Sequence, residues 1–167
     1  MLLIIDRMNH LRFADLMEVY IESNTKNGQE KYPRLSSFEQ LLEVENDFHQ
    51  YLSAVFFRQD GAIYFMWQAC GHYVSALRIE PYDDGLLLCG LETAPSARGH
   101  GYASNLISAV TAYLTEQGSG KIYSHVSKNN FTSLKVHEKC GFQICKDYAV
   151  YSDGSVLHNS YTLIYKY

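Results

Sequence analysis

Hydrophobic positions in the first quarter of the chain predict one strand, one helix and a loop. The apolar run Met1 to Ile5 is long enough for a strand. A helical period over His10 to Ser23, with Asn9 as the N-cap, predicts the first helix. The segment Asn24 to Pro33 is polar and contains a glycine, so it is predicted to be a loop.

The middle of the chain predicts a long helix and three consecutive strands. The helix begins at Ser36-Ser37-Phe38-Glu39, which has the capping-box pattern, and runs to about Phe57; a strand over Ser53 to Arg58 is the alternative for its end. The strands are separated by hairpin turns at Cys70-Gly71 and Asp83-Asp84-Gly85. They cover Ala62 to Gln68, Tyr73 to Tyr82 and Leu86 to Thr93. The third strand is apolar on both faces, which is typical of a central strand covered by helices on both sides.

The remaining pattern alternates helix and strand. A helix is predicted over Ser104 to Gln117, a strand over Lys121 to Val126 and a short helix from Asn130 to Gly141. Two closing strands, about Phe142 to Tyr151 and Val156 to Tyr167, flank the turn Ser152-Asp153-Gly154. The order β-α-α-β-β-β-α-β-α-β-β predicts one domain over residues 1–167. Its class is α/β (α+β): a mixed sheet of about seven strands with helices on both faces.

Composition and charge narrow the classes of function. The formal net charge of −4, without a basic run, argues against a nucleic-acid partner. The apolar N-terminus is too short for a signal or membrane segment, so no membrane partner is predicted. The four cysteines have no metal-ligand spacing, which predicts buried thiols in the reducing cytoplasm and no bound metal.

The most specific chemical signal is the turn Arg98-Gly99-His100-Gly101-Tyr102-Ala103, between a predicted strand and a predicted helix. Its glycines leave backbone N–H groups exposed beside the positive end of the helix dipole, which favours a phosphate anion. Neither a P-loop Gly-Lys-Ser/Thr nor a three-glycine dinucleotide pattern is present. The turn therefore predicts a phosphate site of another kind.

Two blocks of the sequence resemble the GNAT superfamily of N-acetyltransferases. The turn is similar to that family's acyl-CoA loop, Gln/Arg-x-x-Gly-x-Gly/Ala, at Arg98, Gly101 and Ala103. The stretch from Asn130 to Phe142 is similar to its second block, and one helix and one strand separate the two blocks as in the family. The resemblance covers roughly residues 73–142; the N-terminal helices and last strands agree only in their order.

The resemblance implies acetyl-CoA as the acyl donor. The acetyl group would pass by direct attack to a primary amine of a small molecule or to a protein N-terminus, with the reactants held in position. The pyrophosphate would lie on the glycine turn, the pantetheine arm against the backbone of Leu91 and Thr93, and Asn130 and Ser133 beside the arm. The Thr93 N–H is expected to steady the carbonyl oxygen.

Two residues are the candidates for proton transfer. Most members of the family have at position 137 a Tyr that protonates the departing thiolate; here His137 could donate that proton, position the substrate, or only pack. Glu92 is the first candidate for the general base, and Glu80 and His125 are the alternatives. Arg78 is expected to bind a substrate carboxylate or to pair with Glu92.

Two other functions are compatible with the same residues. One is a CoA-binding sensor or regulatory module without turnover, and the other is a binder of a different phosphate ligand. Tyr73, Tyr82 and Tyr123 are candidates for lining an acceptor cleft. The sequence leaves the acceptor and the oligomeric state, monomer or homodimer, undecided.

Overall fold

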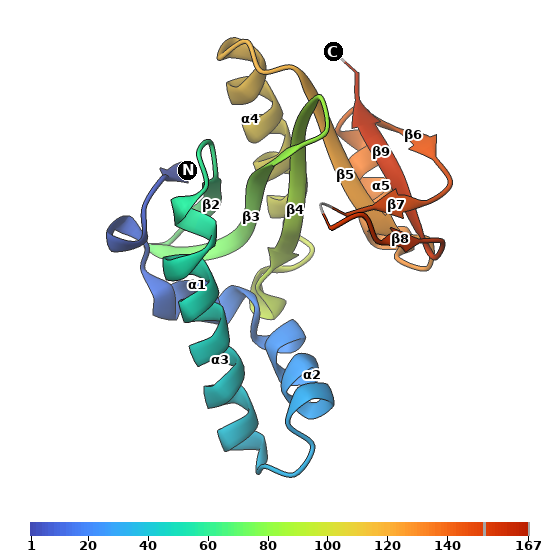
Figure 1. Cartoon of the computed structure of the whole chain (residues 1–167). Helices are drawn as coiled ribbons and strands as arrows, with labels where there is room; N and C mark the ends of the chain where they lie inside the picture. The colour runs from blue at the N-terminus through green and yellow to red at the C-terminus, as the bar shows by residue number, and fades with distance from the viewer. Residues whose placement is uncertain (152, 167) are drawn as a thin grey trace.

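A seven-stranded mixed sheet forms the centre of the computed structural model, which describes residues 1–151 and 153–166 (Figure 1). Parallel pairing occurs between β4 and β5, whereas the other neighbours in the sheet are antiparallel. In spatial order the strands are β1 (Leu2–Ile5), β2 (Ile63–Ala69), β3 (His72–Tyr82), β4 (Gly85–Thr93), β5 (Lys121–Ser127), β9 (Ser160–Tyr165) and β6 (Phe142–Lys146). The short strands β7 (Ala149–Val150) and β8 (Val156–Leu157) pair with each other outside this sheet.

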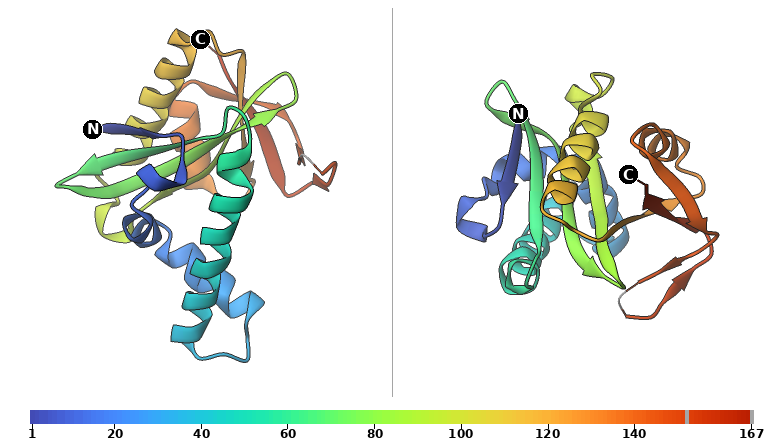
Figure 2. Two further views of the ribbon diagram at one scale, coloured as in Figure 1. Left: turned by 60° about the vertical axis from the view of Figure 1, so that its left-hand side comes forward. Right: turned by 90° about the horizontal axis from the view of Figure 1, so that it is seen from above.

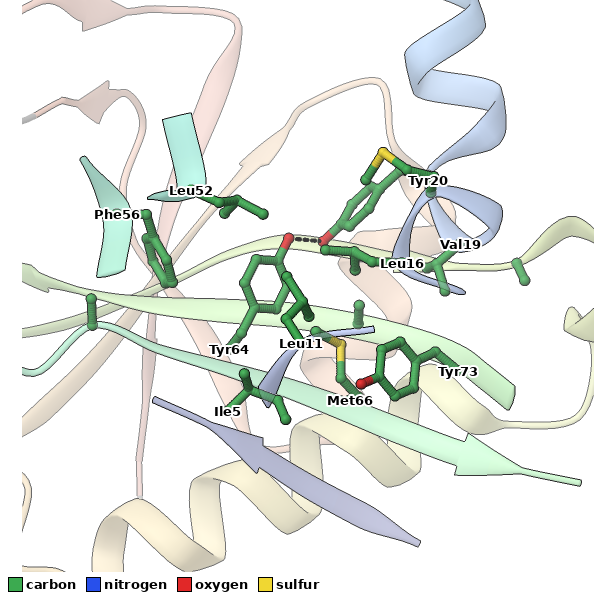
Figure 3. Packing of buried hydrophobic residues seen from close by; sticks show 14 of the residues in the cluster. Ile5, Leu11, Leu16, Val19, Tyr20, Leu52, Phe56, Tyr64, Met66 and Tyr73 are labelled. Carbon is green, nitrogen blue, oxygen red and sulfur yellow. Dashed lines mark hydrogen bonds between the residues drawn. The ribbon is translucent and has the colours of Figure 1, made fainter. Parts of the chain in front are cut away.

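Helices cover both faces of the sheet (Figure 2). They are α1 (Phe13–Val19), α2 (Ile21–Lys31), α3 (Ser37–Ala54), α4 (Tyr102–Glu116) and α5 (Phe131–Lys139), with 3-10 turns at Met8–His10, Phe56–Arg58 and Pro95–Ala97. Along β2, Tyr64 and Met66 pack with α1 and α3 (Figure 3). Phe65 between them packs with α4 on the opposite face. Successive side chains of a strand point to opposite faces, so one central strand serves two cores. The predicted fold class is confirmed.

The N-terminal helices differ from the prediction. The expected helix over His10 to Ser23 is broken, because Asn9 lies in a 3-10 turn and α1 ends just before Tyr20. The expected loop from Asn24 to Pro33 is wrong, since α2 continues to Lys31. Gly28 lies inside α2, where an added Cβ would come within 3.1 Å of Gln40 on α3. Close packing of two helices, rather than a turn, therefore accounts for this glycine.

The long helix and the closing strands also differ in part. The capping box at Ser36 and Glu39 is present, but α3 ends at Ala54 and a 3-10 turn follows, so the alternative strand is wrong. The two predicted closing strands are four shorter ones, because the chain leaves the sheet after Lys146 and forms the β7–β8 pair. Ser152 of the predicted turn and Tyr167 lie outside the described residues.

The central strands part in the middle of the sheet. The parallel pairing of β4 with β5 ends at Leu88 and Ser124. Opposite β3, Cys89 pairs with Arg78 and Glu92 pairs with Ala76, so β4 contains one extra residue there, a β-bulge. Gly90 within the bulge has φ +62°, a left-handed conformation that favours glycine. A bulge beside parted strands leaves backbone groups available to a ligand.

Candidate active site

Three cavities meet at the bulge formed by Gly90, Leu91 and Glu92. The loop cleft, about 620 Å³, lies between β4, the turn before α4, and α5. The strand pocket, about 180 Å³, lies between β4, β5 and α5. The helix cleft, about 740 Å³, lies between α2, α3 and the strands β3 and β4. Gly90 lines the strand pocket and the helix cleft, Leu91 lines the strand pocket and the loop cleft, and Glu92 lines both clefts.

The loop cleft has the features of an anion site. Gly99 and Gly101 have φ +81° and +76°, and a Cβ added at either would meet open space rather than protein atoms. The helix α4 begins at Tyr102, two residues earlier than predicted, and no side chain of the described residues caps its first turn. Its N–H groups are therefore directed at a ligand with the positive end of the helix dipole behind them. Such a cradle can bind a phosphate group.

Arg98 connects the glycine turn to α2 and β4 through hydrogen bonds. Its Nη2 donates to Glu22 Oε2 on α2 at 2.6 Å, and its Nε donates to the Thr93 carbonyl oxygen at 3.3 Å. The guanidinium is half-exposed, with 51% of the side chain accessible, so it remains within reach of a bound anion. Arg98 thus links the loop, β4 and α2.

Nearly all residues predicted to bind the donor are brought together in this cleft. The shared lining comprises Leu91, Thr93, Arg98, Gly99, Gly101, Tyr102, Ala103, Asn130 and Ser133. His100 differs: its Nδ1 contacts the Arg98 carbonyl oxygen at 2.9 Å, its ring stacks on Tyr102, and its side chain lines a separate cavity beside α1. Asn130 Oδ1 accepts from the Ser133 N–H at 3.1 Å and so caps α5.

His137 lies in the strand pocket with both ring nitrogens hydrogen bonded. Nδ1 donates to the Ser133 carbonyl oxygen at 2.8 Å, because a carbonyl can only accept, and Nε2 contacts Ser124 Oγ at 3.0 Å. The side chain is 1% exposed, and burial lowers the pKa of His137, so the neutral ring is favoured. Nε2 of that tautomer accepts the Ser124 proton. Ser124 was not predicted as a site residue, because it meets His137, thirteen residues further along the chain, only through the packing of α5 on β5.

Glu92 is a partly buried carboxylate at the junction of the two clefts. Burial raises the pKa of Glu92, against a hydrogen bond from Ser23 and the charge of Arg98, which lower it. A raised pKa brings a carboxylate closer to the range in which it accepts a proton near neutral pH. Among the alternatives, Glu80 accepts from Arg78 Nε at 2.7 Å, and His125 contacts the Tyr82 hydroxyl at 3.2 Å.

Arg78 pairs with Glu80 rather than with Glu92. Its guanidinium lines the helix cleft beside Gly90 and lies 5.8 Å from the centre of the Tyr51 ring. The thiol of Cys89, by contrast, is ineffective as a nucleophile, because burial raises its pKa to about 12. These positions leave Glu92 as the ionisable side chain that both clefts share.

Apart from Arg78 and Glu92, the helix cleft is built from residues that the sequence did not identify. Tyr20 and Tyr51 line it, whereas Tyr73, Tyr82 and Tyr123 lie elsewhere. The other lining groups are polar residues of α2 and an apolar edge of α3, namely Ser23, Asn24, Asn27, Glu30, Lys31, Val44, Asp47 and Phe48. Lys31 forms an ion pair with Asp47, while Glu30 and Glu92 contribute further negative charge. The cleft thus combines an aromatic wall with carboxylates and with the guanidinium of Arg78, which suits a small polar ligand.

The comparisons with known proteins agree with this geometry. Residues 13–142 match the sequence pattern described as the Acetyltransferase (GNAT) family. No curated protein matches the chain.

In the part of the chain that the structure describes, no group of three or more His, Cys, Asp or Glu side chains is placed to hold a metal ion. In the same residues, no helix is long and apolar enough to cross a membrane.

Several solved structures have a similar fold. A ribosomal-protein-alanine N-acetyltransferase from Brucella melitensis is 20% identical over 97% of this chain and 98% of its own, with a TM-score of 0.66. The PaiA N-acetyltransferase from Thermoplasma acidophilum, solved with coenzyme A, is 14% identical over 100% of this chain and 99% of its own, with a TM-score of 0.63. An acetyltransferase from Bacillus subtilis, solved with CoA, is 13% identical over 73% of this chain and 83% of its own, with a TM-score of 0.55.

Proposed function

The chain belongs to the GNAT family of acetyltransferases, and from the geometry of its clefts we propose that it transfers the acetyl group of acetyl-CoA to a primary amine of a small molecule. The observation that carries the proposal is the junction at the bulge, where Glu92 lines both the loop cleft and the helix cleft. The donor occupies the loop cleft and the acceptor occupies the helix cleft, so the two react across β4.

The donor is held mainly by backbone groups. The glycine turn and the first turn of α4 bind the pyrophosphate, and Arg98 adds a positive charge beside it. The thin pantetheine arm lies between the parted strands β4 and β5, next to Leu91, Thr93, Asn130 and Ser133. The thioester supplies an activated acyl group, and the protein positions it toward the bulge.

The acceptor amine enters from the helix cleft as an ammonium ion and loses a proton to Glu92 before it attacks. Its body packs against Phe48 and Tyr51, and its polar end faces the acidic side chains of α2 and α3. A small molecule is favoured over a protein N-terminus because the walls of the cleft come from two helices and the sheet of the same chain.

We propose that His137 acts through Ser124. Before the reaction the Ser124 hydroxyl donates to Nε2 of His137, which holds it in place. When the thiolate of CoA leaves, the hydroxyl turns to donate to the sulfur instead, and the thiolate takes up the second proton that the attacking nitrogen releases. The Ser133 carbonyl oxygen fixes the ring tautomer. A direct proton donation from His137 requires the imidazolium form, which burial disfavours.

The organisation as a single domain, the cytoplasmic location and the monomeric or homodimeric state stay predictions.

Release of free thiol from acetyl-CoA in the presence of a panel of amines tests the function. Amine-dependent release supports the transferase. Tight CoA binding without release for any amine would favour the alternative, a non-catalytic CoA sensor. If CoA fails to stabilise the fold against heat, the loop cleft holds a different phosphate ligand.

The variant Glu92→Gln tests the role of the base. We expect kcat to fall about 10²- to 10⁴-fold, the range for a general base, while the Kd of acetyl-CoA is unchanged. The kcat of the wild type should rise with pH as Glu92 loses its proton, around a pKa above the ordinary value of Glu. This acidic limb of the pH profile should disappear in the variant. Glu30→Gln, at the far end of the helix cleft, is the matched control and should retain the limb. An unchanged pH profile in Glu92→Gln would exclude the assignment.

A further inference from the structure

Two buried tyrosines reach the backbone of the bulge from the helix side of the sheet. The Tyr64 hydroxyl on β2 donates to the Tyr20 hydroxyl at 2.8 Å (Figure 3). The Tyr20 hydroxyl in turn donates to the Gly90 carbonyl oxygen. Tyr20 is 5% exposed and Tyr64 is fully buried. Phenol groups packed so deeply in a hydrophobic cluster are costly unless their hydroxyls are bonded, and here both are.

The peptide that the Tyr20 hydroxyl contacts lies in the β-bulge of β4. Gly90 and Leu91 lie in the bulge, between the residue pairs that join β4 to β3, and beyond the last residue that pairs with β5. This peptide therefore lies where the regular register of β4 is interrupted on both sides. The Tyr20 hydroxyl supplies a hydrogen bond to its Gly90 carbonyl.

The ends of two side chains lie close to Gly90. A Cβ at this position would lie 2.6 Å from Arg78 Nη1 and 3.3 Å from the Tyr20 hydroxyl. Together with φ +62°, this contact accounts for glycine at the bulge. The carbonyl of Gly90 is consequently fixed from the helix side by Tyr20, with Arg78 packed beside it.

We propose that the Tyr64–Tyr20 hydroxyl pair holds the Gly90–Leu91 peptide so that the Leu91 N–H is presented to the carbonyl oxygen of the acyl donor. In a trans peptide the C=O and the following N–H point in opposite directions, so anchoring the Gly90 carbonyl toward Tyr20 turns the Leu91 N–H away from it. Leu91 lines the loop cleft and the strand pocket, where the thioester lies in the proposed function, on which this inference rests.

The two hydrogen-bonded hydroxyls also make the Leu91 N–H a stronger hydrogen-bond donor. Each O–H in a chain polarises the next, and a hydrogen bond to a peptide carbonyl polarises the N–H of the same peptide. Burial raises the pKa of Tyr64 to about 12 and that of Tyr20 well above its usual value, so both hydroxyls keep their protons. The donor to the oxyanion is thus the Leu91 N–H, two residues before the Thr93 N–H that the sequence suggested. Tyr20 and Tyr64 are positioning residues.

The infrared carbonyl stretch of bound acetyl-CoA, labelled with ¹³C at the thioester carbon, tests this role without an acceptor. In the wild-type protein the band should lie below its frequency in water, because the Leu91 N–H bonds the oxygen. In Tyr20→Phe the band should return toward the free value with the Kd of acetyl-CoA unchanged, and in Tyr64→Phe it should return part of the way. Tyr73→Phe, which removes another buried hydroxyl of the same cluster, should leave the band at the wild-type frequency.

Turnover supplies a second measurement. With an amine identified by thiol release, we expect kcat of Tyr20→Phe to fall about ten- to a hundredfold, somewhat less than the loss of a whole oxyanion donor, with little change in either KM. An unshifted band in the wild-type protein, or a wild-type band in Tyr20→Phe, would overturn the inference even where turnover upholds the transferase. If acetyl-CoA does not bind the wild-type protein, the proposed function fails and this inference fails with it. Should Tyr20→Phe fail to fold, the partial shift in Tyr64→Phe decides.

Discussion

The loop cleft and the helix cleft lie on two sides of one strand and are built in different ways. The loop cleft is formed largely by consecutive residues, the turn from Arg98 to Ala103 and the start of α4, and it presents backbone N–H groups. The helix cleft is formed by side chains of α2, α3, β3 and β4, which are far apart in sequence. A ligand common to many enzymes is bound by local backbone geometry, whereas a ligand specific to one enzyme is bound by side chains that only the tertiary fold brings together.

Among the variants that separate the two clefts, the largest effect is expected from a substitution in the glycine turn, which should weaken CoA binding. In Gly101→Ala, a Cβ enters the cradle at a residue with φ +76°, so the turn must shift. Because charge-assisted hydrogen bonds contribute roughly 1.5–3 kcal/mol each, we expect the Kd of CoA to rise about a hundredfold or more, measured by isothermal titration calorimetry.

Gly118→Ala is the matched control for this strain. Gly118 lies at the other end of α4, has φ +71° and also faces open space. Its variant should lose similar thermal stability and bind CoA normally. Equal loss of CoA affinity in both variants would show that the effect comes from general destabilisation of α4 rather than from the cradle.

A smaller effect is expected from the wall of the helix cleft. Phe48→Ala removes an aromatic side chain that contacts Tyr20 and Tyr51. Burial of a Phe side chain contributes about 1.5–3 kcal/mol, so the KM of the acceptor amine should rise about ten- to a hundredfold while the Kd of acetyl-CoA stays constant. Phe38→Ala, at an exposed position of the same helix, should alter neither value. A rise confined to the Kd of acetyl-CoA would contradict the division of the two clefts.

The smallest expected effect concerns stability and pH at the strand pocket. Burial depresses the pKa of His137 in the folded protein below its ordinary value of 6.5, so the unfolded chain binds its proton first as the pH falls. The stabilisation is complete above pH 6.5 and is lost progressively below it. Thermal unfolding between pH 7.5 and 5 should therefore show a smaller acid-induced fall in Tm for His137→Gln than for the wild type. The exposed His158→Gln variant should follow the wild type; identical slopes in all three proteins would show that His137 does not titrate on unfolding.

The same contrast between clefts explains what the sequence could predict. The capping box at Ser36 and the glycines of the phosphate turn act within a few residues, so their local pattern was sufficient. The apolar pattern on both faces of β4 was sufficient to predict a central sheet covered by helices on both sides. Family resemblance then placed Glu92 and His137 beside the predicted turn.

Features that depend on tertiary contacts could not be predicted. Gly28 suggested a loop, yet its absent side chain permits the close approach of α2 to α3. The bulge at Gly90 follows from the register of β3 against β4, and neither strand shows it alone. Tyr20 reaches Gly90 across seventy residues, and Ser124 meets His137 only when β5 packs under α5. Sequence periodicity contains no information on such pairs.

A crystal structure with CoA bound tests the central claim, that donor and acceptor meet at the bulge of β4, most directly. The pyrophosphate should lie on the N–H groups of Gly101 and the first turn of α4, with the pantetheine arm between β4 and β5. The sulfur should end beside Leu91 and Ser124, with Glu92 facing it from the helix cleft. A CoA molecule whose thiol lies away from the bulge, or whose pyrophosphate avoids the glycine turn, would contradict the claim.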